Sequence, residues 1–307
     1  MQLKEALTDA INRLTANQVP SPRLNAELLL MFTLNCDRAY LFAHPERALT
    51  EDEQSRYHAA LAERARGVPA QYITGHQEFW GMDLIVTPAV LIPRPETEHL
   101  IETVLELHRA NLRPQTSDLN SPTYEAGVMQ SPLRIADIGT GSGALAIALA
   151  QEFPRAEIHA TDISPAALEI ARANAARLQL ANRIQFHETD LLTDLVAPFD
   201  FVVSNPPYVG ESEEDQVQLE VRKFEPRNAV FAGPTGLEII ARLIPQAHVA
   251  LRSGGWLVIE ISGTIAAATE HLLRTARDGN NLLWDDVRIL PDLQSIPRVA
   301  RARKPRQ

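Results

Sequence analysis

The sequence predicts an α/β protein, with a doubly wound, mainly parallel sheet preceded by a small helical domain. Strand-like apolar runs alternate with helix-like stretches between residues 133 and 261, which is typical of such a sheet. Before residue 70 the apolar spacing is helical only. A length of 307 residues is long for one core and indicates a second, smaller one. We therefore expect a helical domain at 1–70, a β-hairpin linker at 71–90 and a sheet domain at 91–307.

Composition excludes several classes of function. A net charge of −10 argues against a protein that grips nucleic acid mainly by neutralising phosphates. Cys36 is the only cysteine, which excludes an intramolecular disulfide and a cysteine-based metal site, and the nine histidines show no metal-binding spacing. The first residues lack the apolar core of a signal peptide, and no apolar run approaches ~20 residues. We expect a soluble, cytoplasmic protein with no metal and no membrane partner.

Three helices are expected in the N-terminal domain. Apolar residues recur at helical spacing over 3–14. Ser21 as a cap, followed by Pro22 at the first helical position, begins the second helix. Thr50 and Glu53 form a capping box for the third, which is expected to end at Gly67. The polar, mixed-charge faces of these helices indicate no particular ligand.

The middle of the chain changes pattern twice. Residues 71–86 contain strand-like runs with glycine corners, which predict a β-hairpin. Pro95 is suited to start a helix that continues through Leu105. From Asn111 the chain is rich in Pro, Ser, Thr and Asn with little periodicity, so residues 111–131 are predicted to be a flexible surface insertion.

Five strands are expected in the sheet domain, most of them separated by a helix. They lie at 133–138, 158–162, 184–187, 201–203 and 256–261. Ser164 and Pro165 are suited to start the helix after the second of these strands. Residues 284–303 can supply a final antiparallel pair.

An Asn-Pro-Pro-Tyr turn at residues 205–208 ends the fourth strand, because prolines cannot donate to a sheet ladder. Ligands of open α/β sheets bind at the carboxyl ends of strands. The Asn205 side-chain oxygen and the Pro206 carbonyl can each accept one hydrogen of a planar NH2 group, on whose plane Tyr208 can stack. Pro207 completes the turn. Taken alone, the turn fits equally well a loop whose prolines only stop a strand.

A glycine-rich turn follows the first strand, where backbone N–H groups can approach a ligand closely. Asp162, about 20 residues on, is suited to accept hydrogen bonds from a ribose diol. Together they indicate a nucleoside-containing cofactor, although the spacing also fits a dinucleotide, and glycines of such a turn can serve helix packing alone. Asp190, as a partner for an adenine amino group, and the NH2 receptor at Asn205 favour S-adenosylmethionine over NAD. The turn consists of Gly139, Thr140, Gly141, Ser142 and Gly143.

These motifs carry a family resemblance. Residues 137–143, Asp162, Asp190 and the 205–208 turn resemble the motif series of class I methyltransferases that modify planar exocyclic nitrogens. The N-terminal half resembles the protein-(glutamine-N5) methyltransferases that act on peptide chain release factors. The matching segments are 23–29, 69–75, 78–81, 92–98, 224–227, 254–255 and 298–299.

The resemblance implies a class I methyltransferase domain at 91–307 and a substrate-recognition role for 1–70. It implies S-adenosylmethionine as cofactor and methyl transfer to the glutamine N5 of the Gly-Gly-Gln loop of release factors, which are the expected protein partners. Residues 139–143 would contact the methionine part of the cofactor, Asp162 the ribose, and Asp190 or Leu191 the adenine surroundings. Asn205 would border both cofactor and substrate. Further residues either line the pocket or simply pack: Phe79, Trp80, Arg94, Glu96 and Thr97.

Three other functions remain open from sequence. An adenine-N6 methyltransferase on DNA or RNA would bind its planar NH2 in the same turn, but the acidic charge and the lack of an obvious basic recognition domain weigh against it, so no direct nucleic-acid substrate is expected. A cofactor-binding module without catalysis conflicts with the intact turn, and a dehydrogenase lacks candidate acid–base residues. A basic tail is expected to be a solvated terminus, or to touch a ribosome or an acidic partner: Arg298, Arg301, Arg303, Lys304 and Arg306.

Overall fold

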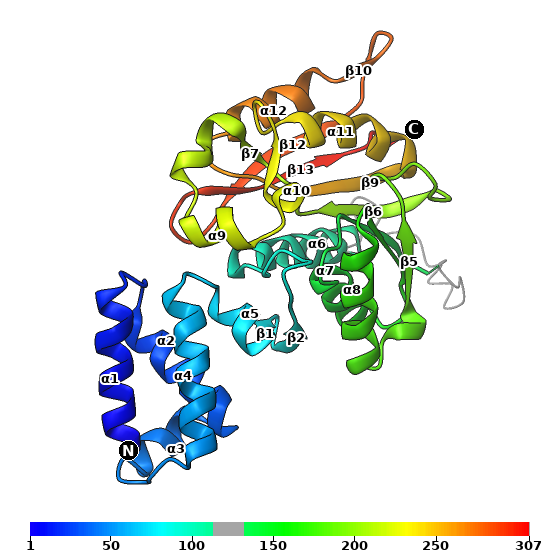
Figure 1. Cartoon of the computed structure of the whole chain (residues 1–307). Coiled ribbons are helices and arrows are strands. Elements are labelled where there is room, and N and C mark those ends of the chain that lie inside the picture. The colour runs from blue at the N-terminus through cyan, green and yellow to red at the C-terminus, as the bar shows by residue number, and fades with distance from the viewer. Residues whose placement is uncertain (113–131, 307) are drawn as a thin grey trace.

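The computed structural model describes residues 1–112 and 132–306. A bundle of N-terminal helices lies beside a larger α/β domain, and α5 with the β1–β2 hairpin joins the two (Figure 1). Apart from its first two residues, the insertion predicted at 111–131 lies outside the described residues. No helix in the described part of the chain is long and apolar enough to cross a membrane.

The N-terminal bundle contains the three predicted helices and one more. The Thr50–Glu53 capping box is present at the start of α4. Ser21 occupies the predicted cap position of α2, but its backbone is left-handed, at φ 47°, rather than extended. Tyr57 is fully buried in the core of the bundle, and its hydroxyl donates to the Ala26 carbonyl at 2.9 Å. The bundle helices are α1 Leu3–Ala16, α2 Pro22–Leu34, the unpredicted short α3 Arg38–Ala43, and α4 Glu51–Ala65.

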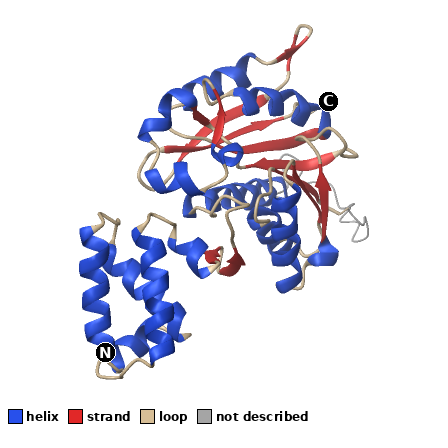
Figure 2. Cartoon of the chain, viewed as in Figure 1, coloured by secondary structure: helices blue, strands red, loops and turns tan. Residues whose placement is uncertain are grey.

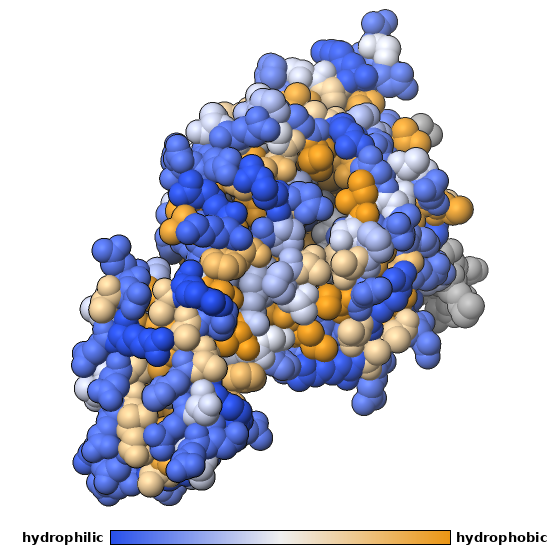
Figure 3. All heavy atoms as spheres, in the orientation of Figure 1, coloured by the Kyte–Doolittle hydropathy of each residue, from blue (hydrophilic) through white to orange (hydrophobic). Residues whose placement is uncertain are grey.

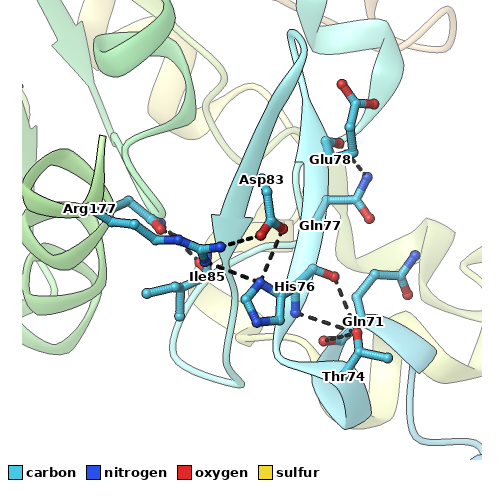
Figure 4. A network of polar contacts seen from close by, with 9 residues as sticks. Gln71, Thr74, His76, Gln77, Glu78, Asp83, Ile85 and Arg177 are labelled. Carbon is cyan, nitrogen blue, oxygen red and sulfur yellow. Dashed lines mark hydrogen bonds and ion pairs between the residues drawn. The ribbon is translucent and has the colours of Figure 1, made fainter. Parts of the chain in front are cut away.

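The predicted hairpin is present as β1 (His76–Phe79) and β2 (Met82–Ile85). Residues 71–74, expected to belong to it, lie instead in the short helix α5 (Ala70–Thr74). Figure 4 shows Asp83 of the hairpin facing both His76, 3.1 Å away, and Arg177 at the end of α8 (Pro165–Arg177). These contacts fasten the hairpin to the sheet domain.

The central sheet has seven strands in the order β12-β13-β9-β6-β3-β4-β5. All five predicted strands are present and run parallel, and the predicted antiparallel pair adds two more at one edge. The chain order reverses between β3 and β6, because β4 and β5 lie on one side of β3 and later strands on the other. The bounds are β3 Arg134–Ile138, β4 Glu157–Asp162, β5 Ile184–Glu188, β6 Phe199–Ser204, β9 Leu251–Glu260, β12 Asp285–Pro291 and β13 Pro297–Arg303.

Helices cover both faces of this sheet (Figure 2), as the doubly wound prediction requires. Ile135 of β3 packs in one apolar cluster with Leu100 and Leu145, while its neighbour Ala136 faces Ile240 and Leu243 in the other. Alternate residues of one strand therefore serve two cores. One face carries α6 Glu98–Leu112, α7 Ala144–Glu152 and α8; the other carries α11 Glu238–Ala250 and α12 Ala266–Thr275.

The bundle and the sheet domain are joined by an ion pair. Arg64, near the end of α4, donates to Glu220 of the short helix α9 (Leu219–Phe224) at 2.7 Å, and the Arg64 side chain is only 4% exposed.

Short elements connect the layers of the sheet domain. The short elements are η1 Pro95–Thr97, η2 Ala181–Arg183, β7 Val209–Gly210, η3 Glu211–Gln216, α9 Leu219–Phe224, α10 Arg227–Val230, β8 Phe231–Gly233, β10 Arg277–Asp278 and β11 Asn281–Leu282.

The prediction of a solvated basic tail is wrong. Arg298 and Arg303 belong to β13 and pair with Asp292 and Asp285, at 3.0 and 2.7 Å. The Lys304 Nζ donates to two backbone carbonyls at 2.7 Å each. The alternation of Arg with small apolar residues in this segment is the pattern of a strand with one face buried.

Candidate active site

A cavity of about 330 Å³ opens at the carboxyl ends of the central strands. The residues that follow β3, β4, β5 and β6 all contribute to its lining, namely Gly139, Ile163, Thr189 and Asn205. Figure 3 shows apolar residues gathered near the middle of the sheet domain on the face in view, within a mostly hydrophilic rim. The cavity therefore lies at the reversal of strand order, where open α/β sheets bind ligands.

The glycine-rich turn borders this cavity with its backbone. Gly139 and Gly141 have left-handed φ values of 72° and 55°, and a Cβ added at either would meet nothing within 4 Å. Backbone conformation rather than crowding thus favours glycine at both. Gly143 differs, because an added Cβ would come within 3.2 Å of Ala171 on α8. Four of the five predicted turn residues line the cavity, and Gly143 instead serves the packing of α8.

Asp162 ties the glycine turn to the next βα unit. Its Oδ2 accepts from the Gly141 N–H and its Oδ1 from the Ser164 N–H, both at 2.9 Å. Burial raises the pKa of Asp162, and these N–H groups act in the opposite direction. The residue lines the cavity. One carboxylate therefore both shapes the turn and faces the ligand space.

Asp137 supports the same turn from beneath. It is fully buried, and its Oδ2 accepts from the Thr140 hydroxyl at 2.6 Å and from the Ala146 N–H at 3.1 Å. Burial raises the pKa of Asp137 to about 7, although these two hydrogen bonds oppose the shift. Among the described residues, Oδ1 has no hydrogen-bond partner. From sequence, Asp137 was expected only as a member of the motif, with no structural role.

Asp190 and Leu191 also line the cavity. Asp190 is paired with Arg242 of α11, which also lines the cavity. Leu191 has a left-handed backbone with φ 56°. An adenine amino group that donates to the Asp190 carboxylate would therefore share this acceptor with the Arg242 guanidinium. Sequence reasoning missed Arg242, which looks like any exposed arginine of an amphipathic helix.

The Asn-Pro-Pro-Tyr turn contributes Asn205 and Pro207 to the lining, whereas Pro206 and Tyr208 are not part of it. The Asn205 Nδ2 donates to the Thr97 hydroxyl oxygen at 3.0 Å. The Tyr208 hydroxyl donates to Glu260 at 3.0 Å, so its polar end points into the protein. The turn thus places its amide at the cavity and its phenol behind it.

The remaining candidates separate into lining and packing residues. Thr97 lines the cavity. Phe79 is 1% exposed in the core, and the Trp80 Nε1 donates to Glu152 at 2.9 Å. Arg94 pairs with buried Glu225 and, like Glu96, is not among the lining residues. For the two aromatic residues the packing interpretation holds.

Much of the lining comes from residues to which the sequence analysis assigned no role in the site. Loop residues before α6 and residues around α10 line the cavity together with the glycine turn. They are apolar or amide side chains, and although Pro93 and Pro226 lie in segments that carry the family resemblance, only the fold shows that they line the cavity. They include Ala89, Val90, Leu91, Pro93, Pro226, Asn228, Ala229 and Phe231. Within the described residues, no group of three or more His, Cys, Asp or Glu is arranged to hold a metal ion.

Two family models match the chain. The model of the PrmC N-terminal domain matches residues 5–75, and that of the methyltransferase small domain matches residues 126–223. Among solved structures, the hMettl16 catalytic domain in complex with an RNA hairpin has a TM-score of 0.53 at 17% identity and covers 84% of each chain. That likeness shows a shared fold alone. Class I methyltransferases, whose fold this is, take their methyl group from S-adenosylmethionine, so this is the cofactor.

Curated relatives resemble the chain from end to end. The release factor glutamine methyltransferase of Koribacter versatilis is 52% identical and covers 99% of both chains. The enzyme of the same name from Moorella thermoacetica is 41% identical over 95% of each chain. Similarity at this level extends through the helical bundle as well as the sheet domain, and the chain therefore belongs to the release factor glutamine methyltransferase family.

Proposed function

We propose that this chain transfers the methyl group of S-adenosylmethionine to the N5 nitrogen of the glutamine in the Gly-Gly-Gln loop of class I peptide chain release factors. One observation supports this most directly. The glycine turn, suited to a nucleoside cofactor, and Asn205, suited to a planar NH2, line the same cavity of about 330 Å³. The full-length relatives carry the name of that reaction.

The cofactor would occupy the side of the cavity that the glycine turn lines. The backbone of residues 139–142 receives the methionine part, and Asp162 accepts hydrogen bonds from the ribose hydroxyls. Asp190 and Leu191 border the adenine. Gly143 assists indirectly, because its packing against Ala171 sets the approach of α8 to the turn.

The acceptor nitrogen is placed by the 205–208 turn. An amide nitrogen is a poor nucleophile because its lone pair is delocalised into the carbonyl, so catalysis rests on placement. Asn205 Oδ1, at the cavity, would accept one amide hydrogen. The carbonyl of Pro206, which follows Asn205 in the turn but is not part of the cavity lining, would accept the other, so that the nitrogen faces the methyl group. S-adenosylmethionine would supply the methyl group, its C–S bond breaking as the new C–N bond forms, and the glutamine nitrogen would then release a proton. The same two acceptors stabilise the positive charge that develops on nitrogen.

The helical bundle grips the protein substrate. In this proposal the chain divides into a recognition domain at 1–70, a hairpin linker at 71–90 and the methyltransferase domain at 91–307. The match of the PrmC N-terminal model to residues 5–75 supports such a division. Since release factors work on ribosomes, the cytoplasm is where the enzyme would meet them.

The test is transfer of labelled methyl from S-adenosylmethionine to purified release factors. One set of factors is intact, and a second has the glutamine of the Gly-Gly-Gln loop replaced by alanine. DNA and RNA are assayed in parallel. We expect label on the intact factor only. Label on nucleic acid would overturn the proposal in favour of adenine methylation, and label on both factor preparations would place the modified residue elsewhere.

A further inference from the structure

Glu260, the last residue of β9, lies behind the active-site turn and outside the cavity lining. It is 1% exposed. Its Oε2 accepts from the Thr97 hydroxyl at 2.6 Å, and its Oε1 accepts from the Tyr208 hydroxyl at 3.0 Å. The Thr97 oxygen is in turn 3.0 Å from the Asn205 Nδ2. A chain of hydrogen bonds thus runs from a buried carboxylate to the amide at the cavity.

The chemistry of these groups fixes the direction of the chain. Both carboxyl oxygens of Glu260 act as acceptors, one for the Tyr208 hydroxyl and one for the Thr97 hydroxyl, so the single Thr97 hydroxyl proton points to Glu260. The Thr97 oxygen can then only accept from Asn205. Of the two ends of the Asn205 amide, only the NH2 end satisfies this contact. The Asn205 Oδ1 is therefore the end left for a ligand in the cavity.

We infer that Glu260 and Thr97 are positioning residues that hold the Asn205 amide with its oxygen toward the substrate. This inference rests on the proposed function, because it explains how the site accepts an NH2 group there and disfavours a carbonyl. Tyr208 completes the arrangement: it occupies the second oxygen of Glu260 and so joins both ends of the 205–208 turn to one carboxylate. A flipped Asn205 would present its own NH2 to the substrate NH2, and two donors cannot bond.

Replacing Glu260 with methionine is the sharpest test. Methionine is similar in size but offers no oxygen acceptor, so the Thr97 hydroxyl is free to donate to Asn205 and the amide can flip. Glutamine is the matched control, since its carbonyl can still accept from Thr97. We expect Glu260→Met to lower kcat about 10- to 100-fold and Glu260→Gln to lower it less, with cofactor affinity within about threefold for both. Wild-type turnover in Glu260→Met would overturn the inference.

A double-mutant cycle separates positioning from a general structural role. If Glu260 acts through Asn205, adding Glu260→Met to Asn205→Ala should change kcat by less than about threefold. A purely structural carboxylate would lower kcat by the same factor in both backgrounds, which contradicts the inference. Should Glu260→Met fail to fold, Thr97→Val replaces it in the cycle, with Thr97→Ser as the control that keeps the hydroxyl.

One readout needs no substrate. In ¹⁵N NMR spectra the Asn205 side-chain NH2 signals, assigned by their loss in Asn205→Ala, should move in Glu260→Met and stay close to wild type in Glu260→Gln. Unmoved signals in Glu260→Met would contradict the inference. If the wild-type enzyme labels no release factor, the proposed function fails while this spectrum still decides the role of Glu260.

Discussion

The two sides of the cavity are held in place by different kinds of contact. On the glycine side, Gly141 and Asp162 are 21 residues apart, and Asp137 and Ala146 only 9. On the side of Asn205, the partner Thr97 is 108 residues away in sequence, and Thr97 reaches Glu260 across 163. The first side is built within two βα units. The second exists only when the whole sheet domain has folded.

This difference teaches which part of a site a sequence can reveal. A strand, a glycine turn and a helix carry their own geometry, so the cofactor side follows from local pattern. The acceptor side takes its geometry from side chains that meet through the fold. We therefore expect substitutions on the two sides to have separable effects, one on cofactor affinity and one on turnover.

The largest effect is expected at the acceptor side. Asn205→Ala removes a hydrogen-bond acceptor from the reacting nitrogen, and kcat should fall about 10²- to 10³-fold, as for other positioned groups that act in the transition state. Affinity for S-adenosylmethionine, measured by titration calorimetry, should stay within about threefold. A parallel loss of affinity would show that the two sides are not independent.

A smaller effect of the opposite kind is expected at the cofactor side. Asp162→Asn keeps the shape of the side chain but puts an NH2 group in place of one of the two oxygens that accept from backbone N–H groups in the wild-type protein. It also removes the negative charge that would face the ribose. Cofactor affinity should fall about tenfold, because charge-assisted hydrogen bonds are the stronger ones. Turnover at saturating cofactor should change little. A variant that binds normally but turns over slowly would assign Asp162 to the acceptor side.

The smallest effect on catalysis is expected at Asp137, where the change should appear as pH-dependent stability. Its pKa of about 7 in the folded protein exceeds the ordinary 3.8, so the folded state binds the proton more tightly than the unfolded state. The resulting stabilisation is complete in acid and is lost as pH rises toward 7. Between pH 5 and 7, Asp137→Asn should reduce the loss in free energy of unfolding by on the order of 1–2 kcal/mol. Urea unfolding at several pH values measures it, and an unchanged slope would contradict it.

The sequence predicted the order of strands and helices well but not every element. Capping boxes and β-rich runs are local signals, and they located α4 and the parallel strands. Several helices were not predicted: α3 depends on the cap at Asp37, α5 was expected as strand because Tyr72 and Ile73 favour both, and α9, α10 and α12 were not expected. The basic tail was misread, because the partners of its arginines on β12 and the loop after it become visible only with the sheet order.

The candidate site was predictable to a similar extent. Gly139 and Asn205 each follow a strand and Asp162 ends one, so the sequence predicted them at one edge of the sheet, and they line one cavity. Glu260 and Arg242 carry no sequence signal, since nothing in a strand end or a helix face distinguishes them from ordinary charged residues. Their positions depend on contacts with Thr97 and Asp190 made across the fold.

The position of β13 in the sheet has a consequence for synthesis on the ribosome. It lies between β9 and β12, although both precede it in the chain. Until β13 emerges, one edge of β9 stays open and β12 lacks the neighbour it has in the native sheet. Open strand edges invite pairing with other chains. A nascent enzyme would therefore pass through an aggregation-prone stage that ends only when its last strand is released and inserted.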